Sequence, residues 1–178
     1  MLRKILNFAI SGILLLGVTA NAAAKPVVIK NLDAAATGPV FISDVSLEAA
    51  EGIWVNDKDR ADILEKIKKR LDAQAPAGGR SAAGVSVYAM RLLFTRFDHG
   101  NGVARLALIG LGQIHMEALV SFLDTDGKLS GQYKVGKGLV LGGIAGGIIS
   151  TSDIENGFAT AVASIVSPKK TEAPAPTK

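Results

Sequence analysis

The chain has 178 residues, no cysteine and a formal net charge of +4. The lack of cysteine excludes a disulfide framework, a thiolate metal site and a lipid anchor on an amino-terminal cysteine. Arg3 and Lys4 belong to the predicted leader. Without them the chain has 18 basic and 16 acidic residues, a net charge of +2. The dense basic surface of a nucleic-acid binder is therefore not expected.

Residues 1–24 have the pattern of a secretory signal peptide. A charged start is followed by an apolar run over 5–18 and by small-x-small cleavage patterns that end at Ala22 and Ala24. The apolar run is shorter than the ~20 residues that a membrane-spanning helix needs. We therefore expect export to the periplasm and cleavage near one of these alanines.

The next segment, residues 25–38, is expected to be a connecting arm with a short strand at 27–29, and residues 39–47 are expected to form a second strand. The irregular stretch 48–56 contains Trp54, the only tryptophan. A single tryptophan is more often a core residue than a ligand platform, and we interpret Trp54 in that way.

Residues 57–74 give the clearest helix prediction. Its apolar stripe consists of Ile63, Leu64, Ile67 and Leu71, and Asn56 or Asp57 can accept hydrogen bonds from the first-turn amides. The basic run Lys66, Lys68, Lys69 and Arg70 could bind an anionic partner, but we interpret it as a solvated helix face. The loop at 75–84 lacks the spacing of a phosphate-binding loop.

Residues 85–98 read as a strand with apolar side chains on both faces, which predicts burial on both sides or a twist between two environments. The next run is half-buried in pattern: Ile114, Met116, Ala118, Val120 and Phe122 share one face, and polar residues such as His115 and Glu117 occupy the other. A tight turn at 124–128 and a returning strand at 129–135 are expected to follow.

Three segments around these strands form a family signature: FDHGNGVAR at 97–105, LIGLG at 108–112 and LDTDGK at 123–128. With them, residues 40–166 resemble a bacterial cell-envelope family known only as a domain of unknown function, numbered 4410. The chain departs from the family at Gln113 and Ile114, where a small residue is usual. The resemblance implies a small exported α+β domain without an established activity.

Within that signature, Asp98 and Arg105 are placed to make an ion pair across a turn, which we interpret as structural. Gly110 and Gly112 form the Gly-x-Gly segment of the same signature. These four residues are the first part of a predicted set of structural-turn or interaction residues.

The set is completed by glycines of the segment 136–149, where Gly138, Gly142 and Gly146 stand four residues apart. Such spacing permits close helix contact in membranes, but the segment is only half a membrane span. We interpret it as a mobile loop or a small hairpin at the sheet edge. The alternative is a contact with the outer membrane or with another copy of the chain.

A second helix is predicted over 152–166, where Ser152 and Glu155 have capping-box spacing. Its apolar stripe comprises Ile154, Phe158, Ala161, Val162 and Ile165. The tail at 168–178 is rich in lysine and proline and is expected to be disordered.

No spacing of ionisable residues indicates a catalytic, metal or cofactor site. His99 and His115 lack the paired spacing of zinc ligands. Asp124, Asp126 and Ser130 resemble a calcium loop only faintly and are interpreted as a hairpin turn. A hydrolase would require His115 to lie beside a carboxylate and an exposed serine, because catalytic triads are spatial arrangements.

Together these patterns predict a signal peptide at 1–24, a single domain at 25–167 and a tail at 168–178. The domain is expected to be an α+β two-layer sandwich, with an antiparallel or mixed sheet of four or five strands and two helices packed on one face. We expect a non-catalytic periplasmic module without a cofactor, which binds an unknown envelope protein or itself. The alternative is an outer-membrane-associated or oligomeric protein that uses segment 136–149.

Overall fold

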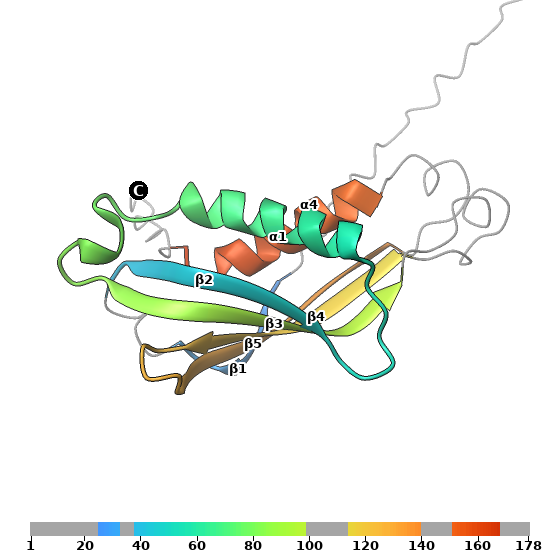
Figure 1. Cartoon of the computed structure of the whole chain (residues 1–178), viewed down its shortest axis with the longest axis horizontal. Helices are drawn as coiled ribbons and strands as arrows, with labels where there is room; N and C mark the ends of the chain where they lie inside the picture. Colours follow the sequence, from blue (N-terminus) through green and yellow to red (C-terminus); the bar gives the residue numbers. More distant parts are fainter. Residues whose placement is uncertain (1–24, 33–37, 99–113, 140–150, 168–178) are drawn as a thin grey trace, which may run out of the picture.

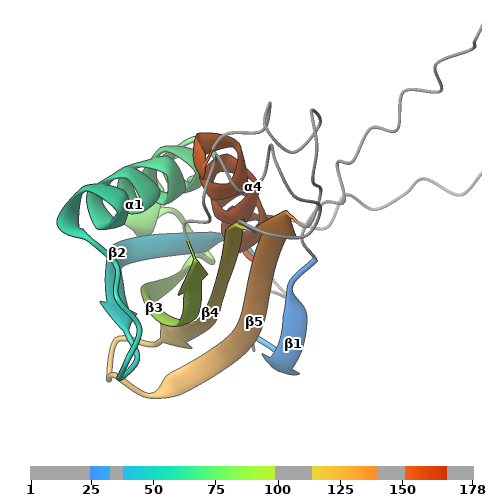
Figure 2. The ribbon, with the colours of Figure 1, turned by 90° about the vertical axis from the view of Figure 1, so that its right-hand side faces the viewer.

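The computed structural model of the chain describes residues 25–32, 38–98, 114–139 and 151–167 (Figure 1). Their elements are β1 (Val27–Lys30), β2 (Val40–Ala49), α1 (Asp57–Asp72), the 3-10 helix η1 (Gly79–Ser81), β3 (Ser86–Asp98), β4 (Ile114–Leu123), β5 (Leu129–Leu139) and α4 (Thr151–Ser164). The strands form one sheet, and Figure 2 shows both long helices on the same face of it. This arrangement confirms the predicted α+β sandwich.

The sheet is mixed, with strand order β1-β5-β4-β3-β2. β2 and β3 are parallel, and α1 lies in the crossover that joins them, whereas the other neighbouring strands are antiparallel. A parallel pair needs such a long connection, since a tight turn can join only antiparallel strands. β5 continues to Leu139, four residues beyond its predicted end at Val135, so Gly136 and Gly138 lie in a strand.

β3 contains a bulge at Thr95. The register with β4 shifts between Phe94 and Arg96, so one extra residue lies on β3. Before the shift the even-numbered residues face the helices, and after it Phe97 does so with only 8% of its surface exposed. A bulge changes which residues point inward, because strand side chains alternate with a period of two. The bulge thus explains why Phe97 is buried although its parity is odd, whereas the odd-numbered apolar residues before it, such as Leu93, are half-buried on the face away from the helices.

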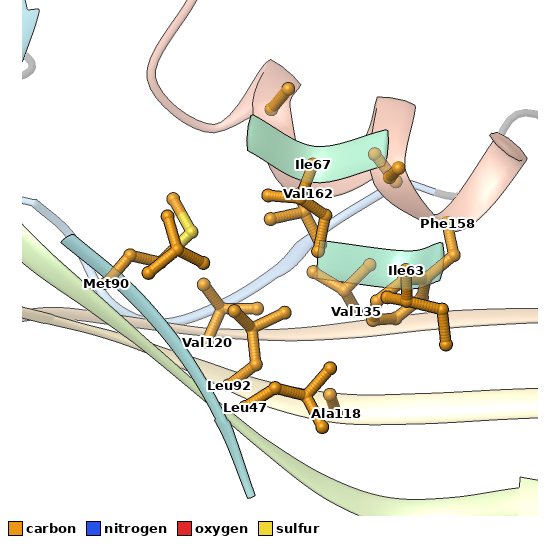
Figure 3. Packing of buried hydrophobic residues seen from close by; sticks show 14 of the residues in the cluster. Leu47, Ile63, Ile67, Met90, Leu92, Ala118, Val120, Val135, Phe158 and Val162 are labelled. Carbon is orange, nitrogen blue, oxygen red and sulfur yellow. The ribbon is translucent and has the colours of Figure 1, made fainter. Parts of the chain in front are cut away.

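The core lies between the sheet and the two helices, and β4 runs through its centre (Figure 3). The five residues predicted to face inward on β4 are Ile114, Met116, Ala118, Val120 and Phe122, and each has 0% of its surface exposed. From α4, Phe158 stacks on Phe94 of β3 with ring centroids 5.4 Å apart. Burial of a large apolar side chain contributes roughly 1.5–3 kcal/mol, so these contacts hold the helices on the sheet.

The basic run of α1 is divided between solvent and the neighbouring helix. Lys68 and Lys69 are exposed, as predicted, but Lys66 donates from Nζ to Oε2 of Glu155 at 2.6 Å. Arg70 donates from Nε to the hydroxyl of Thr160 on α4 at 2.9 Å. The prediction of a wholly solvated helix face was therefore wrong for two of its four members.

The same ion pair corrects the prediction for the start of α4. Glu155 was expected to reach back to the helix start as the second half of a capping box. Its side chain is only 5% exposed and instead binds Lys66 of α1. Removal of one partner from a buried ion pair is costly, so this pair fixes how α4 lies against α1.

Trp54 lies on the surface, so the prediction of a core residue was wrong. It has 71% of its surface exposed, although the turn that carries it is fixed by a hydrogen bond from the amide of Ile53 to the carbonyl of Ala50 at 3.0 Å. The core position is taken by the next residue, Val55, which is 5% exposed.

No helix among the described residues has the length and apolar character needed to cross a bilayer.

Candidate functional site

The helices cover one face of the sheet, and the opposite face, which we call the open face, carries a mixture of polar and apolar side chains. Two cross-strand rows run over it. One places Arg91 beside Ser121 and Gln132, and the other places Leu93 beside Leu119 and Lys134. β2 extends these rows with Ser46 and Glu48. The open face is therefore a broad surface on which leucines lie between charged side chains.

At one end of the open face Glu117 is the centre of a polar cluster that also contains Thr95, Lys134 and His115. Oε1 of Glu117 accepts hydrogen bonds from the Thr95 hydroxyl at 3.0 Å and from Nζ of Lys134 at 3.0 Å. The Thr95 hydroxyl is also 3.4 Å from the carbonyl oxygen of Glu117. Thr95 reaches this position because it is the bulged residue of β3, so the bulge both closes the core and builds the cluster.

These contacts keep Glu117 ionised. Burial by itself would raise the pKa of its carboxyl group, but the hydrogen bonds from Lys134 and Thr95 and the positive charges of Lys134 and His115 outweigh it and lower the pKa below the ordinary value. A carboxyl group with a lowered pKa is a poor proton donor near neutral pH. The geometry favours a structural ion pair over a general acid.

His115 lies beside Asp98 in the sheet, since the two residues are cross-strand partners at the end of β3 and β4. One condition for a hydrolase, a histidine beside a carboxylate, is thus met in register. However, Oδ2 of Asp98 accepts from Nε of Arg96 at 2.7 Å. The nearest serine on the same face of β4 is Ser121, six residues or about 20 Å along the strand, and its hydroxyl accepts from Gln132 at 3.0 Å.

The turn at Asp124 is a hairpin turn, as predicted. Oδ1 of Asp124 accepts from the amides of Asp126 at 3.0 Å and Lys128 at 2.9 Å. Gly127 has a φ of 77°, a left-handed conformation that glycine adopts without strain. The carboxylate of Asp124 therefore holds its own turn. In the described part of the chain no three acidic or histidine side chains are grouped so as to hold a metal ion.

The predicted turn and interaction residues lie only in part within the described structure. Asp98 is at the end of β3, where its described ion pair is with Arg96. Gly138 is in β5 opposite His115. The remaining predicted residues, Arg105, Gly110, Gly112, Gly142 and Gly146, lie outside the described residues.

Two features of the surface were not predicted from the sequence. The partnership of Glu117 with Lys134 joins residues of adjacent strands and needs the register of β4 with β5, which alternation alone does not provide. A shallow hollow of about 590 Å³ lies on the outer face of α1 and is lined by Ala61, Leu64, Glu65, Lys68, Lys69 and Asp72. All its lining residues come from the exposed side of one helix, and their side chains do not point toward a common centre where a ligand could bind.

Comparison with known proteins gives similarities of fold and family. No curated protein matches the chain. Among solved structures, a variant form of the PelC dodecamer from Paraburkholderia phytofirmans is similar at 12% identity and a TM-score of 0.47, with 83% of this chain and 95% of that chain covered. A second form of the same dodecamer is similar at 13% identity and a TM-score of 0.47, with coverages of 73% and 89%.

A third solved structure, a candidate lipoprotein from Caulobacter crescentus CB15, is similar at 17% identity and a TM-score of 0.38, with coverages of 67% and 82%. The family profile called Domain of unknown function (DUF4410) matches residues 20–143, a range that contains α1 and all five strands. This match covers more than half of the chain and agrees with the motifs around Asp98 and Asp124. The chain therefore belongs to the DUF4410 family.

Proposed function

We propose that this chain is a non-catalytic binding or accessory module of the cell envelope, exported to the periplasm, and that its open face contacts the partner. The observation that carries the proposal is the engagement of the charged groups at the polar end of that face. Glu117 binds Lys134 and Thr95, and Asp98 binds Arg96. Charged groups that are paired in this way favour a role in a contact surface over a role as nucleophile or general acid.

The composition of the open face suits a protein partner. Leu93 and Leu119 are half-buried cross-strand neighbours, and the rows around them carry the charges of Arg91, Glu48 and Lys134. An apolar centre with a charged rim is typical of surfaces that bind other proteins reversibly. The partner that fits is an envelope protein with an apolar patch and both signs of charge around it.

The periplasmic location rests on the leader pattern of residues 1–24, and the family resemblance supports it. Trp54, 71% exposed in the turn between β2 and α1, offers a second apolar contact for a partner. Tryptophan is enriched among the residues that contribute most to binding energy.

The second candidate function is association with the outer membrane, or with other copies, through residues 136–149. Gly136 and Gly138 belong to β5, so that part of the segment is a sheet strand and not a helix with a glycine stripe. Washing of membranes with high salt and then mild detergent separates the two candidates. Release with the soluble fraction supports the periplasmic module, and release only by detergent supports the membrane contact.

The contact surface is tested by photocrosslinking in living cells. A photoreactive amino acid is placed at Leu119 on the open face and, as a matched control, at Lys68 on the outer face of α1. We expect one protein species to be captured from position 119 and not from 68, and its yield to fall at least tenfold when Arg91 is replaced by Glu. Equal capture from both positions, or capture that the Arg91→Glu change leaves intact, would contradict the proposal.

A further inference from the structure

The two edges of the sheet differ in chemistry. β1 forms one edge, next to β5, and no described strand lies beyond it (Figure 2). Its first three residues are all apolar and largely exposed: Val27 at 61%, Val28 at 51% and Ile29 at 55%. The other edge is β2, whose outer residues include exposed Ser43, Asp44 and Glu48.

Edge strands normally carry charges or other features that prevent pairing with further strands. The only charged residue in β1 is Lys30. Its Nζ donates to the carbonyl oxygen of Leu129, the first residue of the neighbouring strand β5, at 2.6 Å. The charge is thus directed back toward the parent sheet. β1 is short, and its register with β5 shifts between Val28 and Lys30, which marks a bulge at Ile29. Its other exposed side chains are apolar, and an apolar edge can pair with another strand.

β1 is held firmly enough to present that edge in a fixed shape. The amide of Leu32, two residues after the strand, donates to the Tyr133 hydroxyl of β5 at 2.9 Å, and Leu32 is only 3% exposed. A Cβ atom on Gly131 would lie 2.9 Å from Cα of Leu32, so the two backbones pack as closely as a glycine allows. A preformed edge loses less conformational freedom on binding than a flexible one does.

The helices leave room for a further strand beside β1. α4 packs on β4 and β5, and α1 packs on α4 and β2. Figure 1 likewise shows both helices above the sheet and away from β1. In a double sheet with the order β5-β1-β1-β5, the two β5 strands would be three strand spacings, or about 14 Å, apart. Each copy's α4 lies over β4 and β5. The two α4 helices would therefore be farther apart than the roughly 8–10 Å between packed helices, so they would not clash.

We propose that β1 pairs antiparallel with β1 of a second copy of this chain about a two-fold axis, with Val28 opposite Val28. By sequence position this register brings Val27 next to Ile29, the bulged residue of β1, on both sides, so the exposed apolar side chains of the two copies gather along one seam. A shift of the axis to Val27 would place Ile29 opposite Lys25, and a shift to Ile29 would place Val28 opposite Lys30. The central register is therefore the one that matches apolar side chains throughout.

Pairing of β1 with β2 of another copy is less favourable, because it would place valines beside the polar edge that carries Asp44 and Glu48. It would also join unlike edges and so make rings or open chains, whereas the two-fold pairing closes after two copies. A four-residue strand buries little area, so the dimer is weak and depends on concentration. The proposal stands on the edge alone and is independent of the function proposed for the open face.

The decisive test uses the lack of cysteine in the chain. Directly opposed residues of an antiparallel pair have Cα atoms about 4.5–5.5 Å apart, which lies within the Cα distances of about 4.4–6.8 Å at which disulfides form. We expect the full-length Val28→Cys protein, expressed with its own leader, to form a disulfide-linked dimer on mild oxidation. The matched control Ser43→Cys, on the opposite edge, is expected to stay monomeric.

A mixture of the two cysteine variants distinguishes the two pairings. A mixed disulfide between Cys at position 28 and Cys at position 43 would overturn the two-fold arrangement and indicate pairing of unlike edges. Failure of Val28→Cys to crosslink above the level of Ser43→Cys would overturn self-association through β1.

Sedimentation of the protein without cysteine gives a second, independent measurement. We expect a concentration-dependent dimer, and we expect Val28→Lys to weaken it at least tenfold, because the pairing would bring two like charges face to face. Trp54→Lys makes the same change of charge at an exposed site away from β1, and is expected to leave the dimer intact. A protein that stays monomeric up to about 1 mM, a concentration at which even a millimolar complex is substantially formed, would overturn the proposal.

Discussion

β4 divides the molecule into two regions with different tasks. Its even-numbered residues have 0% exposure and pack under α1 and α4, whereas its odd-numbered residues are half-buried and carry His115, Glu117 and Ser121 on the open face. The same backbone thus supports a fully buried apolar layer and a half-buried layer that mixes polar and apolar side chains. A substitution on the first layer should change stability, and one on the second should mainly change contacts with other molecules.

The largest expected effect is on the covered layer, at Phe94. Its ring stacks on Phe158 and meets Phe97 edge-on with centroids 5.3 Å apart. Phe94→Ala is expected to lower the free energy of unfolding by about 3–5 kcal/mol, since it leaves a cavity in a fully buried position. Urea denaturation measures this change. Leu93→Ala, one residue away on the open face, is the matched control, and an equal loss there would remove the distinction between the two faces.

The next effect concerns the contact between the helices. Glu155→Ala would leave Lys66, which is 21% exposed, without its described carboxylate partner. We expect a loss of about 2 kcal/mol, below the usual cost for a fully buried pair, because Lys66 retains some access to water.

Replacement of both Lys66 and Glu155 by Met tests the physical reason for that loss. The double variant should recover most of the stability in the same urea titration, because neither charge is then buried. A double variant as unstable as Glu155→Ala would show that packing, and not an unpaired charge, causes the loss.

A third prediction concerns the attachment of β1 to the sheet. In Gly131→Ala the new Cβ would lie 2.9 Å from Cα and 3.0 Å from Cβ of Leu32, so backbone must shift. We expect a loss of about 1–2 kcal/mol, together with faster amide exchange in β1. Gly127→Ser is not a suitable control because Gly127 has a φ of 77°. Gly136→Ala, whose new Cβ would have contacts no closer than 3.9 Å, is suitable and should leave exchange in β1 unchanged.

The fold was largely predictable because its signals are local. The alternation of β4 and the apolar stripe of α1 need only the order of residues within one element, and both predictions were confirmed. The bulge at Thr95 was missed, since a change of parity is defined only against the partner strand. The Lys66–Glu155 pair was missed because the two residues are 89 positions apart in the sequence.

The candidate site was less predictable than the fold. His115 and Glu117 were correctly placed on the polar side of β4, but the pattern of one strand does not say which side chain of β5 lies next to them. Trp54 was wrongly placed in the core because its neighbour Val55 fills the buried position instead. In both cases the deciding information is a register or a turn, which depends on residues that are distant in sequence or on backbone geometry.

The smallest expected effect lies in the open face and depends on pH. The pKa of Glu117 is lowered in the folded protein, so its ion pair stabilises the fold above the pKa of the unfolded chain, ordinarily about 4.5. This contribution disappears as the pH falls through the lower pKa of the folded state. Because Lys134 is 48% exposed, the pair is partly screened by solvent, and we expect a contribution of only about 0.5–1 kcal/mol.

Glu117→Gln should therefore be slightly less stable than the wild type at pH 7 and equally stable at strongly acidic pH. The difference should begin to shrink below the ordinary pKa of a glutamate and vanish below the lower pKa of the folded state. Urea titrations at a series of pH values measure this difference directly, and contributions from other carboxylates such as Asp62 cancel in it. Glu48→Gln makes the same chemical change at an exposed position of the open face and should give no such difference. A stability difference for Glu117→Gln that persists at pH 2 would mean that the cluster acts through packing of Thr95 and Lys134 and not through the charge of the carboxylate.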